Sequence, residues 1–238
     1  MVIVIGHRGA AGLEPENTLR SIKAAIEIGV DEVEIDVRVS KDGYLVVIHD
    51  ETVDRTTNGH GFVRDLTLKE IKNLDAGQGE QVPTLKEVLD LTRNKVVLDI
   101  ELKVSEALNK TLCLIEEMKI QDHVVLISFK HDLLLKARSS NPNIRTGAIF
   151  FESPKLSSLD VIKKYADGIY VHYRNINKDL IDEAHSKNLR IGVWTVNSIS
   201  DMKRMIRLGV DAVTTDRPDL LIRLLNSFFK GVNHKSKL

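Results

Sequence analysis

Eight short apolar runs recur along the sequence, and each is followed by a segment with the periodicity of an amphipathic helix. The apolar runs span residues 2–5, 33–37, 96–102, 124–129, 146–150, 168–171, 191–196 and 212–215. Near-continuous Val/Ile runs separated by helical segments are typical of a parallel sheet covered by helices. Eight such units in a chain of 238 residues predict an α/β fold closed into a (β/α)8 TIM barrel.

Residues 51–83 interrupt this repeat after the second predicted strand. Their glycines and polar residues predict an irregular loop, with a short helix beginning at the capping box formed by Thr67 and Glu70. A second capping box, Thr84 with Glu87, predicts the start of the helix that completes the second unit. Because the insertion emerges where barrel active sites lie, we expect it to cap the mouth and contact the outer end of a substrate.

Composition indicates an ordinary globular chain. No linker-like stretch separates the units, so residues 1–238 are expected to form one barrel domain with a frayed polar tail at 230–238. Its 34 basic and 34 acidic side chains balance, which argues against a nucleic acid partner. We expect a cytoplasmic protein without stable membrane insertion, because no run resembles a signal peptide or approaches the length of a membrane span. The single cysteine, Cys113, suits a reducing compartment and is expected to fill space in the core.

The second predicted strand carries two acids on one face. Side chains alternate along a strand, so Glu34 and Asp36 point one way and the apolar residues between and beside them point the other way. Asp42-Gly43 then predicts a two-residue hairpin turn that places Asp36 opposite His49. The hairpin is therefore expected to bring an imidazole against two carboxylates.

The strands on either side add further polar groups. The first strand ends at His7-Arg8, and the third places Asp99, Glu101 and Lys103 on one face, opposite apolar residues that must lie against the outer helices. Catalytic groups of barrels gather at the carboxyl ends of the strands. Seven side chains are expected to converge there: Glu34, Asp36, Glu101, His7, Arg8, His49 and Lys103.

Three carboxylates are hard oxygen ligands of the kind that Mg²⁺ or Ca²⁺ prefers, and without further cysteines a closed zinc site is not expected. With one divalent ion, Arg8 and Lys103 would leave a single positive charge, which a phosphodiester monoanion would neutralise. The alternative is a buried ion-pair network without a ligand. The two histidines and the unbalanced charge favour a site over that alternative.

Several motifs resemble the glycerophosphodiester phosphodiesterase family in order and approximate spacing over essentially the whole chain. They are His7-Arg8-Gly9, Pro15-Glu16-Asn17-Thr18, Glu34-x-Asp36, Lys41-Asp42-Gly43, His49-Asp50, Pro83-Thr84-Leu85, Glu101-x-Lys103, Trp194-Thr195-Val196-Asn197 and Thr215-Asp216-x-Pro218. The resemblance implies a metal-dependent barrel enzyme, related in fold to phosphoinositide-specific phospholipases C. Such an enzyme cleaves small-molecule glycerophosphodiesters to sn-glycerol 3-phosphate and an alcohol.

The resemblance also implies roles for individual residues. Glu34, Asp36 and Glu101 would hold one divalent metal ion, Mg²⁺ or Ca²⁺ with Mn²⁺ as a further candidate, and His7 and His49 would be the general base and acid. Arg8 and Lys103 would contact phosphate oxygens, and Trp194 would form an apolar wall for the glycerol moiety, although its pattern alone favours a core position. The attacking group is either water or the glycerol 2-hydroxyl.

Two other functions fit the same residues. One is lysophospholipase D action, with an acyl chain under the insertion, and the other is a non-catalytic phosphate-binding barrel. A metal-dependent amidohydrolase is disfavoured because the first strand lacks two histidines separated by one residue. Oligomeric state and head-group preference stay open.

A few polar residues are given structural roles or left without one. Asn17 and Asp216 are expected to be helix caps, although Asn17 could also brace the His7 loop. Four histidines near helix ends or in the tail are expected to be solvated: His123, His131, His185 and His234. His172 and Phe151 are not assigned to the pocket.

Overall fold

Eight parallel strands form a closed barrel in the computed structural model, which describes residues 2–235 of the chain and the side chains of residues 2–227. In order around the barrel they are β1 (Ile3–His7), β2 (Glu32–Val39), β4 (Val97–Leu102), β5 (Val124–Ser128), β6 (Arg145–Phe150), β7 (Gly168–His172), β8 (Arg190–Trp194) and β9 (Ala212–Thr215). Each pairs in parallel with the next, and β1 pairs with both β2 and β9, which closes the sheet. The predicted (β/α)8 barrel is confirmed.

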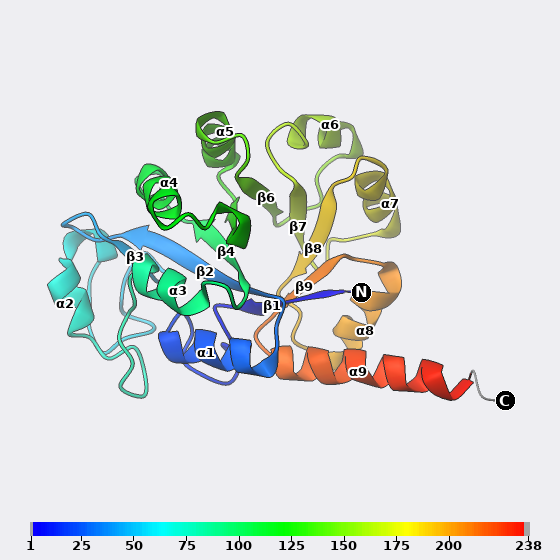
Figure 1. Cartoon of the computed structure of the whole chain (residues 1–238), viewed down its shortest axis with the longest axis horizontal. Coiled ribbons are helices and arrows are strands. Elements are labelled where there is room, and N and C mark those ends of the chain that lie inside the picture. The colour runs from blue at the N-terminus through cyan, green and yellow to red at the C-terminus, as the bar shows by residue number, and fades with distance from the viewer. Residues whose placement is uncertain (1, 236–238) are drawn as a thin grey trace.

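Helices occupy the outside of the barrel (Figure 1). They are α1 (Leu19–Ile28), α3 (Leu85–Thr92), α4 (Ala107–Met118), α5 (His131–Ser140), α6 (Leu159–Ile162), α7 (Lys178–Ser186), α8 (Ile199–Leu208) and α9 (Pro218–Lys235), with short 3-10 turns at η1 (Val63–Asp65), η2 (Gln121–His123) and η3 (Leu156–Ser158). Among the described residues, no helix is long and apolar enough to cross a membrane.

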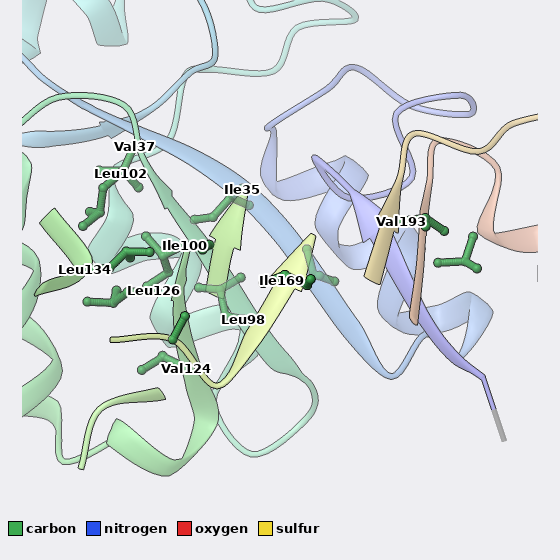
Figure 2. Close-up of a cluster of buried hydrophobic side chains, with 14 of the residues drawn as sticks. Ile35, Val37, Leu98, Ile100, Leu102, Val124, Leu126, Leu134, Ile169 and Val193 are labelled. Atoms are coloured by element: carbon green, nitrogen blue, oxygen red, sulfur yellow. The ribbon is translucent and has the colours of Figure 1, made fainter. Parts of the chain in front are cut away.

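The main hydrophobic core lies between the strands and these helices. Ile35 of β2, Ile100 of β4 and Leu126 of β5 are completely buried there. Figure 2 shows these side chains gathered with Leu134 of α5. Since alternate residues of a strand face opposite ways, the apolar face of β4 points outward and its acids point inward, as predicted.

Inside the barrel, Tyr170 fills the centre. Its ring lies in space that two glycines leave open: a Cβ added at Gly192 would be 2.6 Å from the ring, and one added at Gly147 would be closer still. Tyr170 packs in an inner cluster that includes Ile5, Ile127, Ile149 and, at the rim, Trp194. The floor of the barrel mouth is therefore formed by the side chain of Tyr170, for which two glycines leave room.

The hairpin has a different turn from the one predicted. Ser40 pairs with Tyr44 across a three-residue loop, and Gly43 adopts φ +87°, the geometry of a type I turn closed by a glycine bulge. Consequently β3 (Leu45–Val47) is shifted by one residue, and Asp36 faces Ile48 instead of His49. The predicted two-residue turn and its pairing are wrong because loop length, which the Asp-Gly pair alone does not fix, sets the register.

The insertion forms a small unit of its own beside β3. Both capping boxes are confirmed, at α2 (Leu68–Lys72) and at α3. Seven buried residues make its core: Val46, Ile48, Val53, Val63, Ile71, Ala76 and Val82. The insertion therefore packs against the hairpin at the side of the barrel (Figure 1).

Several predictions about single residues fail. Cys113 is exposed on α4 and does not fill the core. Asn17 is not the cap of α1, because Thr18 accepts the capping hydrogen bond from the amide of Ser21. His131 is partly buried, with Nε2 3.0 Å from the carbonyl oxygen of Ile149. His123 and His185 are exposed as predicted, and the side chain of His234 lies outside the described residues.

The packing around Tyr170 predicts the effect of adding one methyl group. Gly147→Ala is expected to lower the free energy of unfolding by about 1–3 kcal/mol, because the new Cβ would overlap the ring of Tyr170 and force it to shift. Urea denaturation measures the change. The double variant Gly147→Ala/Tyr170→Leu is the control: its loss should be smaller than the sum of the two single losses, and strict additivity would contradict the overlap.

Candidate active site

The carboxyl ends of the strands surround one pocket. Its lining residues are His7, Arg8, Glu34, His49, Asp99, Glu101, Lys103, Ile127, Phe129, Ile149, Tyr170, Trp194, Thr195 and Thr214. Strands β1, β2, β4 and β8 supply most of the polar groups, and the chain bends inward at His49 after leaving the hairpin. None of these lining residues belongs to 51–83. The insertion therefore flanks the mouth, and the prediction that it caps the pocket is wrong.

Three carboxylates meet at the wall formed by β2 and β4. Glu34, Asp36 and Glu101 each offer an oxygen, and these atoms lie within 4.8 Å of one another. All three side chains are buried. The parallel register that puts Asp36 beside Glu101 produces this cluster directly from the inward faces of two neighbouring strands. Like charges this close cannot all be buried in ionised form without cations.

Two cationic side chains lie against the acids. Lys103 Nζ is 2.8 Å from Glu101 Oε1 and 3.3 Å from Asp36 Oδ1. Arg8 Nε is 3.2 Å from Asp36 Oδ2, and the Arg8 amide donates to Glu34 Oε2 at 3.1 Å. Charge compensation is uneven as a result. Asp36 lies between both cations, whereas Glu34 is compensated by the charge of Arg8 and by the hydrogen bond from its amide.

The pKa values of Glu34 and Asp36 reflect this difference in charge compensation. Burial, reinforced by the neighbouring charges of Asp36 and Glu101, raises the pKa of Glu34 well above its ordinary value. Burial also acts to raise the pKa of Asp36, but Lys103 and Arg8 outweigh it, and the pKa is lowered. A divalent cation at this wall would supply the charge that Glu34 lacks. Three converging hard oxygen donors fit Mg²⁺, Ca²⁺ or Mn²⁺.

The loop after β1 holds Arg8 in an uncommon backbone conformation. Arg8 has φ 52° and Gly9 has φ 86°, and a Cβ on Gly9 would lie 2.5 Å from the backbone of Ser21 in α1. A non-glycine residue at positive φ costs free energy and persists only where its surroundings hold it. The Arg8 carbonyl accepts hydrogen bonds from the Asn17 amide and from Ser21 Oγ, which fixes the loop.

Asn17 also contacts the acid cluster. Its side-chain Nδ2 donates to Asp36 Oδ2 at 2.9 Å, and its Oδ1 accepts from the Asp36 amide at 3.3 Å. The prediction that it could brace the His7 loop therefore described part of its role. The sequence does not predict the two hydrogen bonds between Asn17 and Asp36, because nothing in the segment around Asn17 indicates a partner on another strand.

His7 is held by an acid from the far end of the chain. Its Nδ1 lies 2.5 Å from Asp216 Oδ1, and Asp216 Oδ2 accepts from Asn197 Nδ2. Burial acts to raise the pKa of Asp216, but the hydrogen bond with His7 helps to lower it. Asp216 was predicted to cap a helix, and the structure instead makes it the partner of His7. With Nδ1 occupied, Nε2 is the ring nitrogen left toward Glu34, 3.9 Å away.

His49 has a matching partner next to it in sequence. Its Nδ1 lies 2.6 Å from Asp50 Oδ1, and its carbonyl accepts from Arg38 Nε at 2.8 Å. Burial lowers the pKa of His49, with Asp36 acting in the opposite direction. The lowered pKa favours a neutral imidazole at pH 7, the form that can accept a proton. His7 and His49 thus each line the pocket with Nδ1 bound to a carboxylate.

Aromatic side chains form the wall opposite the acids. Trp194 lines the pocket with its Nε1 donating to the Tyr170 carbonyl at 3.1 Å, and Phe129 meets it edge-on with ring centroids 5.4 Å apart. The pocket position of Trp194 agrees with the resemblance and not with the core position that its pattern favoured. Phe151 and His172 stack on each other outside the pocket lining.

Asp99 lies one layer deeper, near a second charged group. Below it Arg190 makes two hydrogen bonds of 2.8 Å with Glu32. Both carboxyl oxygens of Asp99 are buried without a hydrogen-bond partner among the described residues. Burial raises the pKa of Asp99 well above its ordinary value, with Glu32 adding to the effect, so a neutral carboxyl is favoured there. In this respect Asp99 resembles Glu34, whose pKa is also raised, and differs from Asp36, whose pKa is lowered.

Known proteins are similar to this chain in both sequence and architecture. A model of the glycerophosphoryl diester phosphodiesterase family matches residues 7–220. The glycerophosphodiester phosphodiesterase of Caldanaerobacter subterraneus subsp. tengcongensis is 39% identical over 236 residues, covering 94% of this chain and 97% of that protein. A glycerophosphodiester phosphodiesterase of Bacillus subtilis is 33% identical, covering 95% of this chain and 87% of that protein.

Solved structures agree with the sequence comparison. An Oleispira antarctica phosphodiesterase in complex with the product sn-glycerol-3-phosphate superposes with a TM-score of 0.89 at 29% identity, covering 94% of this chain and 96% of that one. The glycerophosphodiester phosphodiesterase of Thermotoga maritima gives a TM-score of 0.83 at 30% identity, covering 94% of this chain and 98% of that one. The chain therefore belongs to the glycerophosphoryl diester phosphodiesterase family of enzymes.

Proposed function

We propose that this chain hydrolyses small glycerophosphodiesters to sn-glycerol 3-phosphate and an alcohol, in a reaction that needs a divalent metal ion and uses His7 and His49 as acid and base. The observation that carries the proposal is the convergence of three buried carboxylates, two cations and two carboxylate-bound histidines on one pocket. The product bound to the related Oleispira antarctica phosphodiesterase supports the substrate class.

Glu34, Asp36 and Glu101 would hold the metal. Their donor set suits Mg²⁺ or Ca²⁺, with Mn²⁺ also suitable, because all three donors are carboxylate oxygens. When bound, such an ion supplies positive charge next to the phosphate and so favours the charge that grows on its oxygens.

Arg8 and Lys103 would act on the phosphate directly. Both line the pocket and lie against the acid cluster, so a phosphodiester seated beside Asp36 would meet both. Arg8 presents a planar set of donors and Lys103 a compact charge, and both would stabilise the oxygens as negative charge develops. Trp194 and Phe129 would give the glycerol carbons an apolar surface.

The two histidines would divide the proton transfers. In the first step one imidazole takes the proton from the glycerol 2-hydroxyl as it attacks phosphorus, and the other donates a proton to the departing alcohol. In the second step water opens the cyclic phosphate and the two imidazoles exchange roles. Asp216 and Asp50 would each keep their histidine in one tautomer and stabilise its protonated form.

The proposal predicts metal-dependent release of sn-glycerol 3-phosphate. Purified protein treated with a chelator and resupplied with Mg²⁺, Ca²⁺ or Mn²⁺ is expected to cleave glycerophosphocholine or glycerophosphoethanolamine, measured by an assay coupled to glycerol 3-phosphate. His49→Ala should lower kcat by roughly 100-fold or more, since one proton transfer loses its donor or acceptor. Glu34→Ala should abolish the response to metal.

Matched controls separate these roles from general damage. His185→Ala and Glu27→Ala replace exposed residues of the same types and should keep wild-type rates. Full activity of folded His49→Ala or Glu34→Ala would reject the assigned roles. A rate on lysophosphatidylcholine above that on glycerophosphocholine would favour lysophospholipase D, and binding of glycerol phosphate without turnover in every metal would favour a non-catalytic barrel.

The internal attack predicts a stereochemical outcome. Two successive displacements at phosphorus, each with inversion, give net retention. Hydrolysis of a glycerophosphodiester that is chiral at phosphorus should therefore yield a product of retained configuration, read by phosphorus NMR. Net inversion would mean that water attacks directly in a single step.

The partnership of His7 with Asp216 predicts a pH dependence of stability. Because the folded pKa of Asp216 is lowered, its ionised form stabilises the fold above the ordinary carboxyl pKa of 3.8, and this contribution disappears as the pH falls below that value toward the lowered folded pKa. The free energy of unfolding of Asp216→Asn should lie below that of the wild type at neutral pH, and the gap should narrow in acid. A gap that stays constant with pH would contradict this assignment.

A further inference from the structure

Arg55, in the insertion, makes four hydrogen bonds to two carboxylates. Its Nε donates to Asp50 Oδ2 at 2.7 Å and its Nη2 to Asp50 Oδ1 at 3.0 Å. On its other side, Nη1 donates to Glu16 Oε2 at 2.7 Å and Nη2 to Glu16 Oε1 at 2.8 Å. One planar guanidinium therefore joins two acids that are 34 positions apart in sequence.

These acids lead to two groups of the proposed chemistry. Asp50 Oδ1, which accepts from Arg55, is the same oxygen that contacts His49 Nδ1. Glu16 Oε1, which also accepts from Arg55, is the same oxygen that accepts from Arg8 Nη1 at 2.7 Å. A continuous series of hydrogen bonds thus connects the imidazole of His49 with the guanidinium of Arg8, and Arg55 is its middle member.

The two ends of this series differ in how firmly they are held. Arg8 also contacts Asp36 and sits in the fixed loop after β1, so Glu16 is anchored to the barrel. Among the described residues, the side-chain partners of Asp50 are His49 and Arg55, and Asp50 is 27% exposed. Without Arg55, Asp50 would be free to rotate into solvent and to release His49.

Geometry makes this contact stronger than an ordinary surface ion pair. Arg55 is 49% exposed, and isolated pairs at such sites contribute little. Here both pairs are bidentate and share one rigid group, so fixing one carboxylate also fixes the other. The hydrogen bonds from Arg55, joined by that from His49, hold the pKa of Asp50 well below its ordinary value.

We propose that Arg55 is a positioning residue, which clamps Asp50 to Glu16 and so fixes His49 relative to Arg8 across the pocket. This inference rests on the proposed function, because His49 and Arg8 have their roles only there. It also gives the insertion a function: it supplies the group that ties the end of the hairpin to the loop after β1.

Kinetics of three variants test the proposal. Arg55→Met, which keeps the apolar stem, should lower kcat by roughly 10- to 100-fold, since a small displacement of His49 impairs proton transfer. KM should change by less than about threefold, because Arg8 keeps Glu16 and Asp36 as partners. Arg55→Lys should recover part of kcat, since an ammonium can pair with one carboxylate but cannot bridge both in bidentate fashion.

Arg64→Met is the matched control. Arg64 lies in the same insertion with its guanidinium over the ring of Phe62, 4.7 Å from the centroid, and contacts neither acid. It should retain wild-type kcat. The proposal is overturned if Arg55→Met keeps wild-type kcat, if it loses no more than Arg64→Met, or if only KM changes.

A second measurement does not depend on turnover. Histidine side chains labelled with nitrogen-15 report the Nδ1–H of His49 by NMR, and its exchange with water measures how firmly Asp50 holds it. Exchange should accelerate in Arg55→Met and stay unchanged in Arg64→Met. Equal exchange in the wild type and Arg55→Met would reject the positioning role. A wild-type protein inactive in every metal would instead refute the proposed function, and the NMR result would still decide the role of Arg55.

Discussion

The arrangement of this barrel mouth depends on charge compensation for three carboxylates that two adjacent strands bring together. Parallel pairing of β2 with β4 places Asp36 beside Glu101, with Glu34 one inward position below. Arg8 and Lys103 compensate part of this charge and leave Glu34 poorly matched. Burial of such a group without cations is unfavourable by several kcal/mol per ion. The residues around the cluster, including the loop that holds Arg8 at positive φ, are arranged to supply or to admit positive charge.

Around this cluster the chain builds two similar supports. Each histidine meets a carboxylate at Nδ1, but the partners come from very different places: Asp50 follows His49 directly, whereas Asp216 approaches His7 from the far end of the sequence. The first support continues through Arg55 and Glu16 to Arg8, and the second through Asn197. The aromatic wall and Tyr170 complete the pocket without adding charge. The charged side chains thus lie on one wall of the barrel mouth, and the aromatic side chains lie on the opposite wall.

Local pattern predicted most of the fold and the central acids. Alternation along a strand fixes which side chains face inward, so the sequence alone places Glu34, Asp36, Glu101 and Lys103 inside the barrel. The hairpin register could not be predicted, because it depends on Gly43 adopting a left-handed conformation in a three-residue loop. The partners of the histidines could not be predicted either, because the contact of His7 with Asp216 spans 209 positions and depends on barrel closure. The position of Asp216 just before a helical segment predicts a helix cap, and this local pattern gives no indication of its contact with His7. Arg55 lies in a segment whose composition indicates only a loop.

We propose that Glu34, Asp36 and Glu101 hold a single divalent cation. Anomalous diffraction from crystals soaked in Mn²⁺ tests it most directly, because the signal locates the ion independently of any activity. We predict one strong peak in contact with carboxylate oxygens of all three residues, and its loss in crystals of Asp36→Asn. Absence of a peak at this wall in the wild type, with the acids bound only by Arg8 and Lys103, would mean that these residues do not form a metal site.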